Sequence, residues 1–204
     1  VMFVDEKGSF VFPDIVIGLM GRGLLKDQTG AVLYDIRSSR SVIEEISRLG
    51  GTPTLCKVGH SYAKALLRKT NGVFGGELAG HYYFRENSYC DSAIIACLVV
   101  LGYLNESKQS LSEIIAEISK YQYSGEINFR AENKDELIEI LTTCYDGGEM
   151  SDLDGIRIDY PSWWFNCRKS NTEPYLRLVV EAATSEELET RVKEISELIE
   201  ANKS

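Results

Sequence analysis

The sequence lacks several features that would assign it to a particular class of protein. It has only two histidines and five cysteines in 204 residues. No two cysteines form a Cys-x-x-Cys pair, so their spacing predicts neither a zinc site nor a disulfide framework. Scattered cysteines of this kind are typical of reduced thiols and indicate a cytoplasmic protein. A Gly-x-Gly-x-x-Gly or Walker-type nucleotide-binding loop is also missing.

Basic residues and long apolar runs are scarce as well. The 22 basic and 31 acidic side chains give a net charge of −9, which excludes the broad basic surface of nucleic-acid-binding proteins and argues against an anionic membrane surface. The longest uncharged apolar run, 93–104, has 12 residues, too few to span a bilayer, and we expect it to form a buried helix.

The chain opens within a predicted strand and without an initiator methionine, which suggests a fragment.

The first part of the chain alternates β-branched, apolar segments with helical patterns. Strands separated by helices of this length predict an α/β domain, with three layers and a mostly parallel sheet. The strands are predicted at 1–4, 31–36, 52–58 and 72–78, and the helices at 41–49, 61–69, 92–104 and 110–121.

The pattern changes near 121–125, where closely spaced strands replace the alternation. The last helix is predicted to begin at a capping box at Thr184 or Ser185. We expect residues 1–121 to form the α/β domain, and residues 122–204 to form a small α+β domain with an antiparallel sheet and two helices. In the second domain, strands are predicted at 126–131, 153–160, 163–168 and 175–182, and a further helix at 134–145.

One segment of the second domain has the composition of an anion site. Residues 168–174 read Arg-Lys-Ser-Asn-Thr-Glu-Pro and lie between two predicted strands. A guanidinium can grip two phosphate oxygens, and hydroxyl, amide and backbone N–H donors surround it. Ser, Asn and Pro are also common in turns, so a solvated hairpin turn is the alternative.

Three segments of the first domain follow predicted strands, where ligands collect in open α/β sheets. Segment 75–81 supplies Glu77, a carboxylate suited to two vicinal sugar hydroxyls, and His81. Segment 57–61 supplies His60, and segment 35–40 places Arg37 at a helix start, where anions are favoured. The alternatives are a glycine bend at the first, and helix capping by His60-Ser61 or by Ser38 or Ser39 at the others.

Taken in order, Arg37, Gly59-His60-Ser61, Gly76–His81 and Arg168–Pro174 closely resemble the α-D-phosphohexomutases, and most of all the bacterial phosphomannomutase/phosphoglucomutase branch. Residues 4–8 and 153–157 also fit that pattern. The family has four domains, and this chain resembles the third, sugar-binding domain (1–121) and the fourth, phosphate-binding domain (122–204). The first domain carries the phosphorylated serine and the second an aspartate-rich Mg²⁺ loop, so this chain is expected to hold no metal ligands.

The resemblance implies that the parent protein interconverts hexose 6-phosphate and hexose 1-phosphate through hexose 1,6-bisphosphate. This chain would be the substrate-recognition half, inactive alone, with hexose phosphates and the N-terminal domains as its partners. His81 would lie near the reacting hydroxyl and assist proton transfer. The implied substrate contacts are Glu77 to the sugar hydroxyls, His60 and Arg37 along the sugar and phosphate path, and Arg168, Ser170, Asn171 and Thr172 as the phosphate clamp.

Two positions bear on the identity of the substrate, and one of them, Ala79, departs from the family pattern. Ala79 stands where many relatives have serine, so the preference between mannose and glucose phosphates is not fixed. Leu78 stands where the glucosamine-phosphate mutases usually have glutamine, which disfavours that substrate. The alternative function is a non-catalytic sugar-phosphate-binding module, which an upstream serine and three aspartates would exclude.

Overall fold

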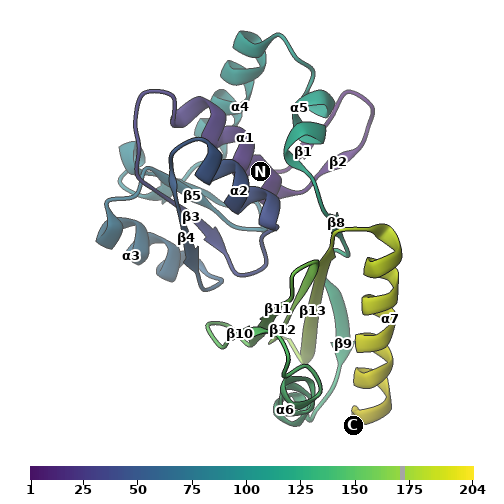
Figure 1. The fold of residues 1–204 in the computed structure, drawn as a ribbon. Helices are drawn as coiled ribbons and strands as arrows, with labels where there is room; N and C mark the ends of the chain where they lie inside the picture. Colours follow the sequence, from purple (N-terminus) through teal and green to yellow (C-terminus); the bar gives the residue numbers. More distant parts are fainter. Residues whose placement is uncertain (171–172) are drawn as a thin grey trace. The chain divides into compact units, whose positions relative to one another are not determined.

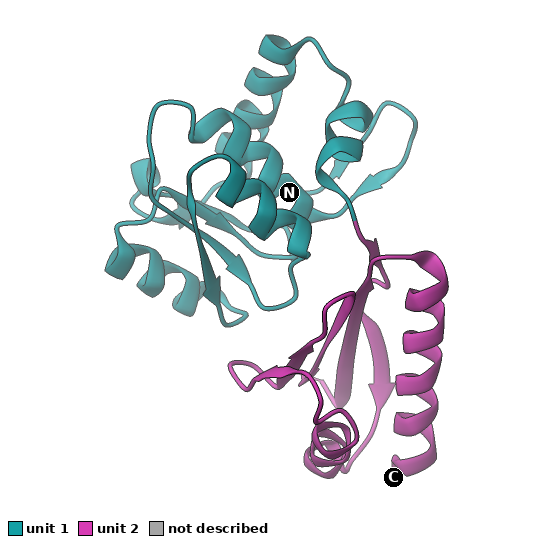
Figure 2. Cartoon of the chain, viewed as in Figure 1, with its two compact units in different colours: residues 1–120 teal, residues 121–204 magenta. Residues whose placement is uncertain are grey.

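The computed structural model describes residues 1–170 and 173–204. The chain forms two compact units, Val1–Lys120 and Tyr121–Ser204 (Figures 1 and 2). The first is an α/β unit and the second an α+β unit with an antiparallel sheet, which confirms the predicted fold class.

The sheet of unit 1 is mixed. Its strand order is β4-β3-β5-β6-β7, in which β3 runs parallel to β4 and β5 while β6 and β7 are antiparallel. The strands predicted at 31–36, 52–58 and 72–78 therefore pair in parallel as expected, whereas the strand predicted at 1–4 lies outside this sheet. Residues 77–81 reverse the chain between β5 and β6. The strands are β3 (Ala31–Asp35), β4 (Thr52–Cys56), β5 (Phe74–Gly76), β6 (Tyr82–Phe84) and β7 (Cys90–Asp91), and a separate hairpin pairs β1 (Phe3–Val4) with β2 (Phe10–Val11).

Helices cover both faces of this sheet, which gives the three expected layers. Val32 and Tyr34 of β3 pack into the main core with α1, α2, α4 and α5. Leu33, between them, faces the opposite side and packs with α3, as the two-residue period of a strand requires. The helices are α1 (Pro13–Leu24), α2 (Arg40–Arg48), α3 (His60–Thr70), α4 (Ala93–Ser107) and α5 (Leu111–Ile118), with a 3₁₀ turn η1 at Arg85–Asn87.

Two helices differ from expectation. α1 was not predicted, because three glycines weaken its helical signal and residues 13–22 are buried all round, so that no polar face marks the period. α4 is present, but the expectation of a buried helix is wrong. Ala96 and Val100 face the core, whereas Ile94, Leu98 and Leu101 are 74%, 64% and 59% exposed.

Unit 2 is an antiparallel sheet with both helices packed on one face. Residues Leu137 and Leu141 of α6 and Ile195 and Ile199 of α7 share one core with the strands. Thr184 caps α7 by accepting a hydrogen bond from the backbone N–H of Glu187 at 3.2 Å. The helices are α6 (Lys134–Cys144) and α7 (Ser185–Asn202). The strand order in the sheet is β10 (Glu149–Ser151), β11 (Ile156–Asp159), β12 (Trp163–Lys169), β13 (Tyr175–Ala182) and β8 (Gln122–Tyr123). A further strand, β9 (Ile127–Arg130), also pairs with β13.

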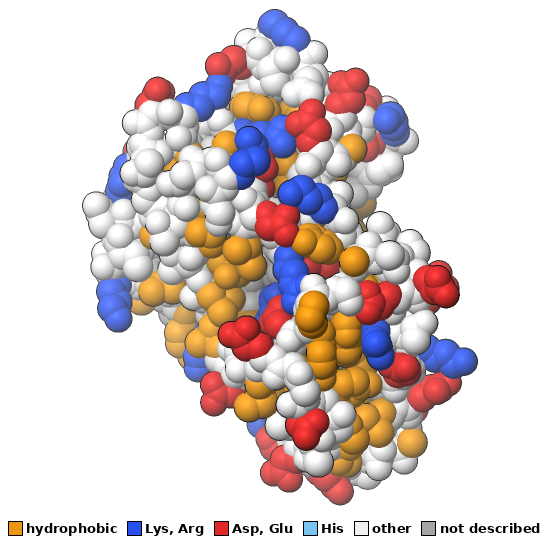
Figure 3. Space-filling view, in the orientation of Figure 1, with side chains coloured by type: hydrophobic (Ala, Val, Ile, Leu, Met, Phe, Trp, Pro, Cys, Tyr) orange, Lys and Arg blue, Asp and Glu red, His pale blue; other side chains and the backbone are white. Residues whose placement is uncertain are grey.

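The distribution of charged side chains on the surface agrees with a sequence that contains many residues of both signs. Acidic and basic side chains are interspersed on the visible face of each unit (Figure 3). Among the described residues, no helix combines the length and the apolar character that crossing a membrane requires.

Candidate functional site

Three of the segments singled out from the sequence lie at one edge of the sheet in unit 1. Strands β4 and β5 both run parallel to β3, so the carboxyl ends of all three point the same way. The segments that follow them, 36–39, 57–59 and 77–81, therefore emerge at the same edge, which is where open α/β sheets bind ligands.

The Asp35 carboxylate joins the first of these segments to the third. Its Oδ1 accepts hydrogen bonds from Arg37 N at 2.8 Å and Arg37 Nε at 3.1 Å, and its Oδ2 accepts from Arg37 Nη2 at 2.7 Å and Leu78 N at 2.8 Å. Asp35 is fully buried, and a bidentate pair of this kind fixes the plane of the guanidinium. Arg37 is thus held in one orientation, and Asp35 also ties the 77–81 loop.

Glu77 joins the third segment to the second, but it does not project from its loop as expected. The side chain is buried, because Oε1 accepts from the Tyr83 hydroxyl and Oε2 from the backbone N–H of Gly59 at 3.1 Å. Burial, and then the neighbouring Glu77 carboxylate, raise the pKa of Tyr83 well above its ordinary value. Tyr83 therefore stays protonated and keeps donating to Glu77.

The two histidines form a cluster with Asp91, a residue that the sequence did not mark. Their ring centroids lie 4.0 Å apart at an interplanar angle of 63°. His81 Nδ1 is 3.3 Å from Asp91 Oδ2, and His60 Nδ1 is 3.9 Å from Asp91 Oδ1. Partial burial raises the pKa of Asp91, but the hydrogen bond from His81 and the charge of His60 outweigh it and hold that pKa below its usual range.

One of the two helix-capping alternatives is present alongside these contacts. Ser39 caps α2 by accepting from Ser41 N at 3.0 Å. The other alternative, capping by His60-Ser61, is wrong: α3 begins at His60, its cap position is Gly59 with a φ of +131° that favours glycine, and no side chain among the described residues caps it. At Ser39, capping and the contacts of Arg37 use different atoms of the same turn.

In unit 2, the predicted anion segment begins at the end of β12. Arg168 lies opposite Arg177 of β13, and Ser170 N donates to Tyr175 O at 2.9 Å across the turn. Asn171 and Thr172 lie outside the described residues, so the structure gives no account of them.

The cations of this segment already face carboxylates. Glu126 accepts from Arg177 Nη1 at 2.9 Å and from Arg168 Nη2 at 3.4 Å. Lys169 Nζ lies 2.6 Å from Asp135 Oδ1. The positive charges of this segment are thus balanced by carboxylates, and an anion would compete with Glu126 for Arg168.

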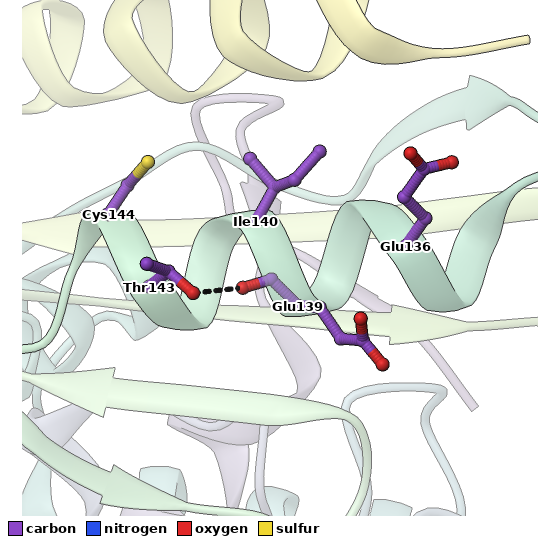
Figure 4. A pocket seen from close by; sticks show the side chains of 5 residues that line it. All are labelled: Glu136, Glu139, Ile140, Thr143 and Cys144. Atoms are coloured by element: carbon purple, nitrogen blue, oxygen red, sulfur yellow. Dashed lines mark hydrogen bonds between the residues drawn. The ribbon is translucent and has the colours of Figure 1, made fainter.

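A shallow depression on unit 2 contains none of these residues. All of its lining side chains come from α6, where Thr143 Oγ1 donates to the Glu139 carbonyl oxygen at 2.9 Å (Figure 4). The lining residues are Glu136, Glu139, Ile140, Thr143 and Cys144. Because the lining side chains all come from one helix, no groups from other elements converge there, and the depression does not indicate a binding site.

Comparisons with known proteins agree with this architecture. The family model "Phosphoglucomutase/phosphomannomutase, alpha/beta/alpha domain III" matches residues 12–121. The model "Phosphoglucomutase/phosphomannomutase, C-terminal domain" matches residues 126–198. The chain belongs to the phosphoglucomutase/phosphomannomutase family.

Relatives in this family are about twice as long as the chain. It is 39% identical to a phosphomannomutase of Methanocaldococcus jannaschii over 197 residues, covering 96% of this chain and 44% of that protein. It is 38% identical to the phosphohexose mutases of Xanthomonas campestris, covering 97% and 45%. A phosphoglucomutase/phosphomannomutase family protein of Burkholderia thailandensis superimposes with a TM-score of 0.82 at 25% identity, covering 98% and 44%. The chain thus spans less than half the length of these relatives and corresponds to their C-terminal part.

One group of described side chains could hold a metal ion. The ligand atoms of His60, His81 and Asp91 lie within 4.8 Å of one another. Mg²⁺, which the family resemblance implies, prefers an octahedral shell of oxygen atoms. Two imidazoles and one carboxylate do not fit that preference, so no step with Mg²⁺ is assigned to these residues.

Proposed function

We propose that this chain is the substrate-recognition half of a phosphohexomutase. The parent would interconvert hexose 6-phosphate and hexose 1-phosphate through a hexose 1,6-bisphosphate intermediate. The observation that carries the proposal is the linkage of three loops at the carboxyl edge of one sheet by the buried carboxylates Asp35 and Glu77. We place the phosphorylated serine and the Mg²⁺ ligands in the remaining half of the parent.

His81 is the proposed proton-transfer group. Because the Asp91 carboxylate accepts the hydrogen bond at Nδ1, the Nδ1–H tautomer is favoured and Nε2 carries the lone pair. That nitrogen can take a proton from a sugar hydroxyl as the hydroxyl attacks phosphorus, and can return it in the reverse direction.

Glu77, Arg37 and His60 would position the sugar. Each Glu77 carboxylate oxygen has more than one lone pair, so it can accept from a sugar hydroxyl while keeping Tyr83 and Gly59. The fixed guanidinium of Arg37 would bind a phosphate or hydroxyl oxygen. Positioning of this kind is most of what a protein can contribute to phosphoryl transfer.

Arg168 and Ser170, with Asn171 and Thr172, would clamp the non-reacting phosphate. The Arg168–Glu126 contact of 3.4 Å is longer than the 2.9 Å bond from Arg177 to the same carboxylate. A phosphate dianion could therefore replace Glu126 on Arg168 while Arg177 retains it. Arg168 would then form a charge-assisted hydrogen bond with the phosphate, and Glu126 would keep its ion pair with Arg177.

The parent is proposed to act on mannose or glucose phosphates in the cytoplasm. The five cysteines are free thiols, which supports a reducing compartment. Glu77 supports hexose binding, whereas Ala79, where a serine is common, lacks a hydroxyl contact to the sugar and leaves the preferred hexose open.

Calorimetric titration of this chain with mannose 1-phosphate and glucose 1-phosphate tests the clamp. We expect weak binding that Arg168→Ala lowers at least about tenfold, because a hydrogen bond to a charged group is lost. Lys193→Ala removes one positive charge from an exposed side chain of α7 and should leave the affinity unchanged. Equal binding by Arg168→Ala and the wild type would contradict the clamp.

If this chain binds neither sugar phosphate, the same variant in the full-length parent decides the question. A fall in kcat/KM there would show that the clamp works only with the other domains present. An unchanged kcat/KM would reject it. A parent that binds sugar phosphates but lacks a phosphorylatable serine and turns over none would be the non-catalytic module instead.

A further inference from the structure

The His60–His81–Asp91 cluster brings together metal-binding atoms from three separate elements. His60 begins α3, His81 precedes β6, and Asp91 ends β7. Both imidazoles direct Nδ1 toward the same carboxylate, at 3.3 Å for His81 and 3.9 Å for His60. The side chains are 45%, 40% and 38% exposed in that order, so an ion could reach them from solvent.

The spacing is close to that of a transition-metal shell. Zn²⁺ binds imidazole nitrogen and carboxylate oxygen at about 2.0–2.2 Å, so neighbouring ligand atoms of a tetrahedral site lie roughly 3.4 Å apart. The distance from His81 Nδ1 to Asp91 Oδ2 already matches this value, whereas His60 Nδ1 lies 3.9 Å from the other oxygen, Oδ1. The ligand atoms of the three residues lie within 4.8 Å of one another, so His60 needs to approach by up to about 1.4 Å. Exposed side chains can move that far by small rotations.

The donor set selects the class of ion. Two imidazoles and one carboxylate suit zinc and its neighbours in the first transition row, and three protein ligands leave a position open for water. The scaffold also restricts the ligands, because His60 packs edge-on to the buried Tyr83 ring at 5.6 Å. Tyr83 in turn pairs with Asp91 across the β6–β7 ladder.

We propose that His60, His81 and Asp91 form a binding site for a zinc-type divalent ion. The site does not depend on sugar binding or on mutase activity. Lys64 is the opposing group: its Nζ lies 4.0 Å from Asp91 Oδ1, so its charge repels an incoming cation. An ion in this site would occupy His81 and compete with its proposed role in proton transfer.

The test is calorimetric titration of the 204-residue chain with Zn²⁺, together with visible absorption on adding Co²⁺. We expect one Zn²⁺ per chain, and at least about tenfold weaker binding in each of His60→Ala, His81→Ala and Asp91→Asn. Lys64→Gln should tighten binding by up to roughly thirtyfold, because a unit charge about 4 Å from a divalent ion costs about 2 kcal/mol in water. Co²⁺ should give the intense d–d bands of a four-coordinate site.

Cys90→Ser is the matched control, because this exposed thiol is the residue next to Asp91 and could bind Zn²⁺ itself. Binding that survives all three ligand substitutions, or that Cys90→Ser abolishes, would overturn the proposal. The exposed positions of the three ligands should let the variants fold, and circular dichroism checks this. Failure to bind Zn²⁺ would leave the sugar-phosphate titration unaffected, so the two proposals fail separately.

Discussion

Gly155 lies directly against the backbone of Arg168, a residue of the proposed phosphate clamp. Its φ is +68°, and a Cβ atom there would lie 2.3 Å from the Cys167 carbonyl oxygen and 2.6 Å from Arg168 Cα. Asn166 Nδ2 fixes the same turn by donating to the carbonyl oxygens of Asp154 and Ile156 at 3.1 and 3.0 Å. Backbone conformation and space therefore both require glycine next to Arg168.

Gly155→Ala should lower the free energy of unfolding of unit 2 by about 3 kcal/mol, the combined cost of a left-handed alanine and an overpacked contact. Urea unfolding followed by tryptophan fluorescence measures this unit selectively, because both tryptophans lie in β12. Gly125→Ala is the control, since Gly125 has a φ of +71° but no atom within 4 Å of its Cβ position. It should lose only about 1 kcal/mol; equal losses would contradict the steric account.

At the scale of elements, an ion network holds three helices of unit 1 together. Arg22 of α1 donates from Nε to Glu45 of α2 and from Nη1 to Glu117 of α5, both at 2.6 Å. Arg48 Nη2 also reaches Glu45, at 2.7 Å. Burial raises the pKa of Glu45, but hydrogen bonds from Arg48 and Arg22 outweigh it and hold the pKa below the ordinary 4.5. The hydrogen bond from Arg22 likewise lowers the pKa of Glu117.

Unit 1 should therefore lose stability in acid. A carboxylate with a lowered pKa in the folded state stabilises fully above its unfolded pKa of about 4.5, and this contribution is lost as the pH falls through the folded pKa. Glu45→Gln should flatten the pH dependence below about 4.5 and cost about 3 kcal/mol at neutral pH, because buried Arg22 loses a partner. Unfolding followed by far-ultraviolet circular dichroism between about pH 3 and 7 measures both effects.

Glu194→Gln provides the comparison for that experiment. Glu194 accepts from Arg191 within exposed α7, and a pair of this kind contributes roughly 0.5 kcal/mol. A Glu45→Gln variant no less stable than Glu194→Gln, with an unchanged acid transition, would show that the helices of unit 1 do not depend on the network.

At the scale of the whole molecule, the chain has the proposed recognition groups but is expected to have no turnover. It corresponds to less than half of its relatives, and the family resemblance places the phosphoryl-bearing serine and the Mg²⁺ loop in the other part. Without a group to donate phosphate, the proposed positioning residues have nothing to transfer.

The purified chain should therefore convert no measurable mannose 1-phosphate or glucose 1-phosphate, even with the 1,6-bisphosphate added. A coupled assay that detects hexose 6-phosphate measures this. Turnover by the chain that Arg168→Ala abolishes would contradict the prediction, because a contaminating mutase would be unaffected by that substitution.

Much of the architecture was predictable because its signals are local. The apolar period of α2, the Thr184 cap of α7, and the closely spaced strands β11–β13 of unit 2 each follow from residues close in the chain. Helix α1 did not, because its three glycines weaken the helical signal and residues 13–22, Asp14 and Arg22 included, are buried, so no polar face marks a period. The exposed face of α4 was missed because composition gives the apolar content of a helix but not which elements cover it.

The sequence by itself determined the family, because the order of four short motifs is a property of the chain alone. It also indicated Arg37, His60, Glu77 and His81 as neighbours, since the carboxyl ends of parallel strands meet at one edge. It did not reveal Asp91, or Tyr83 as the partner of Glu77. Those contacts depend on the β5–β6–β7 antiparallel register, which brings together residues distant in sequence. Only the tertiary structure decided that Glu77 is buried and that the two histidines share one carboxylate.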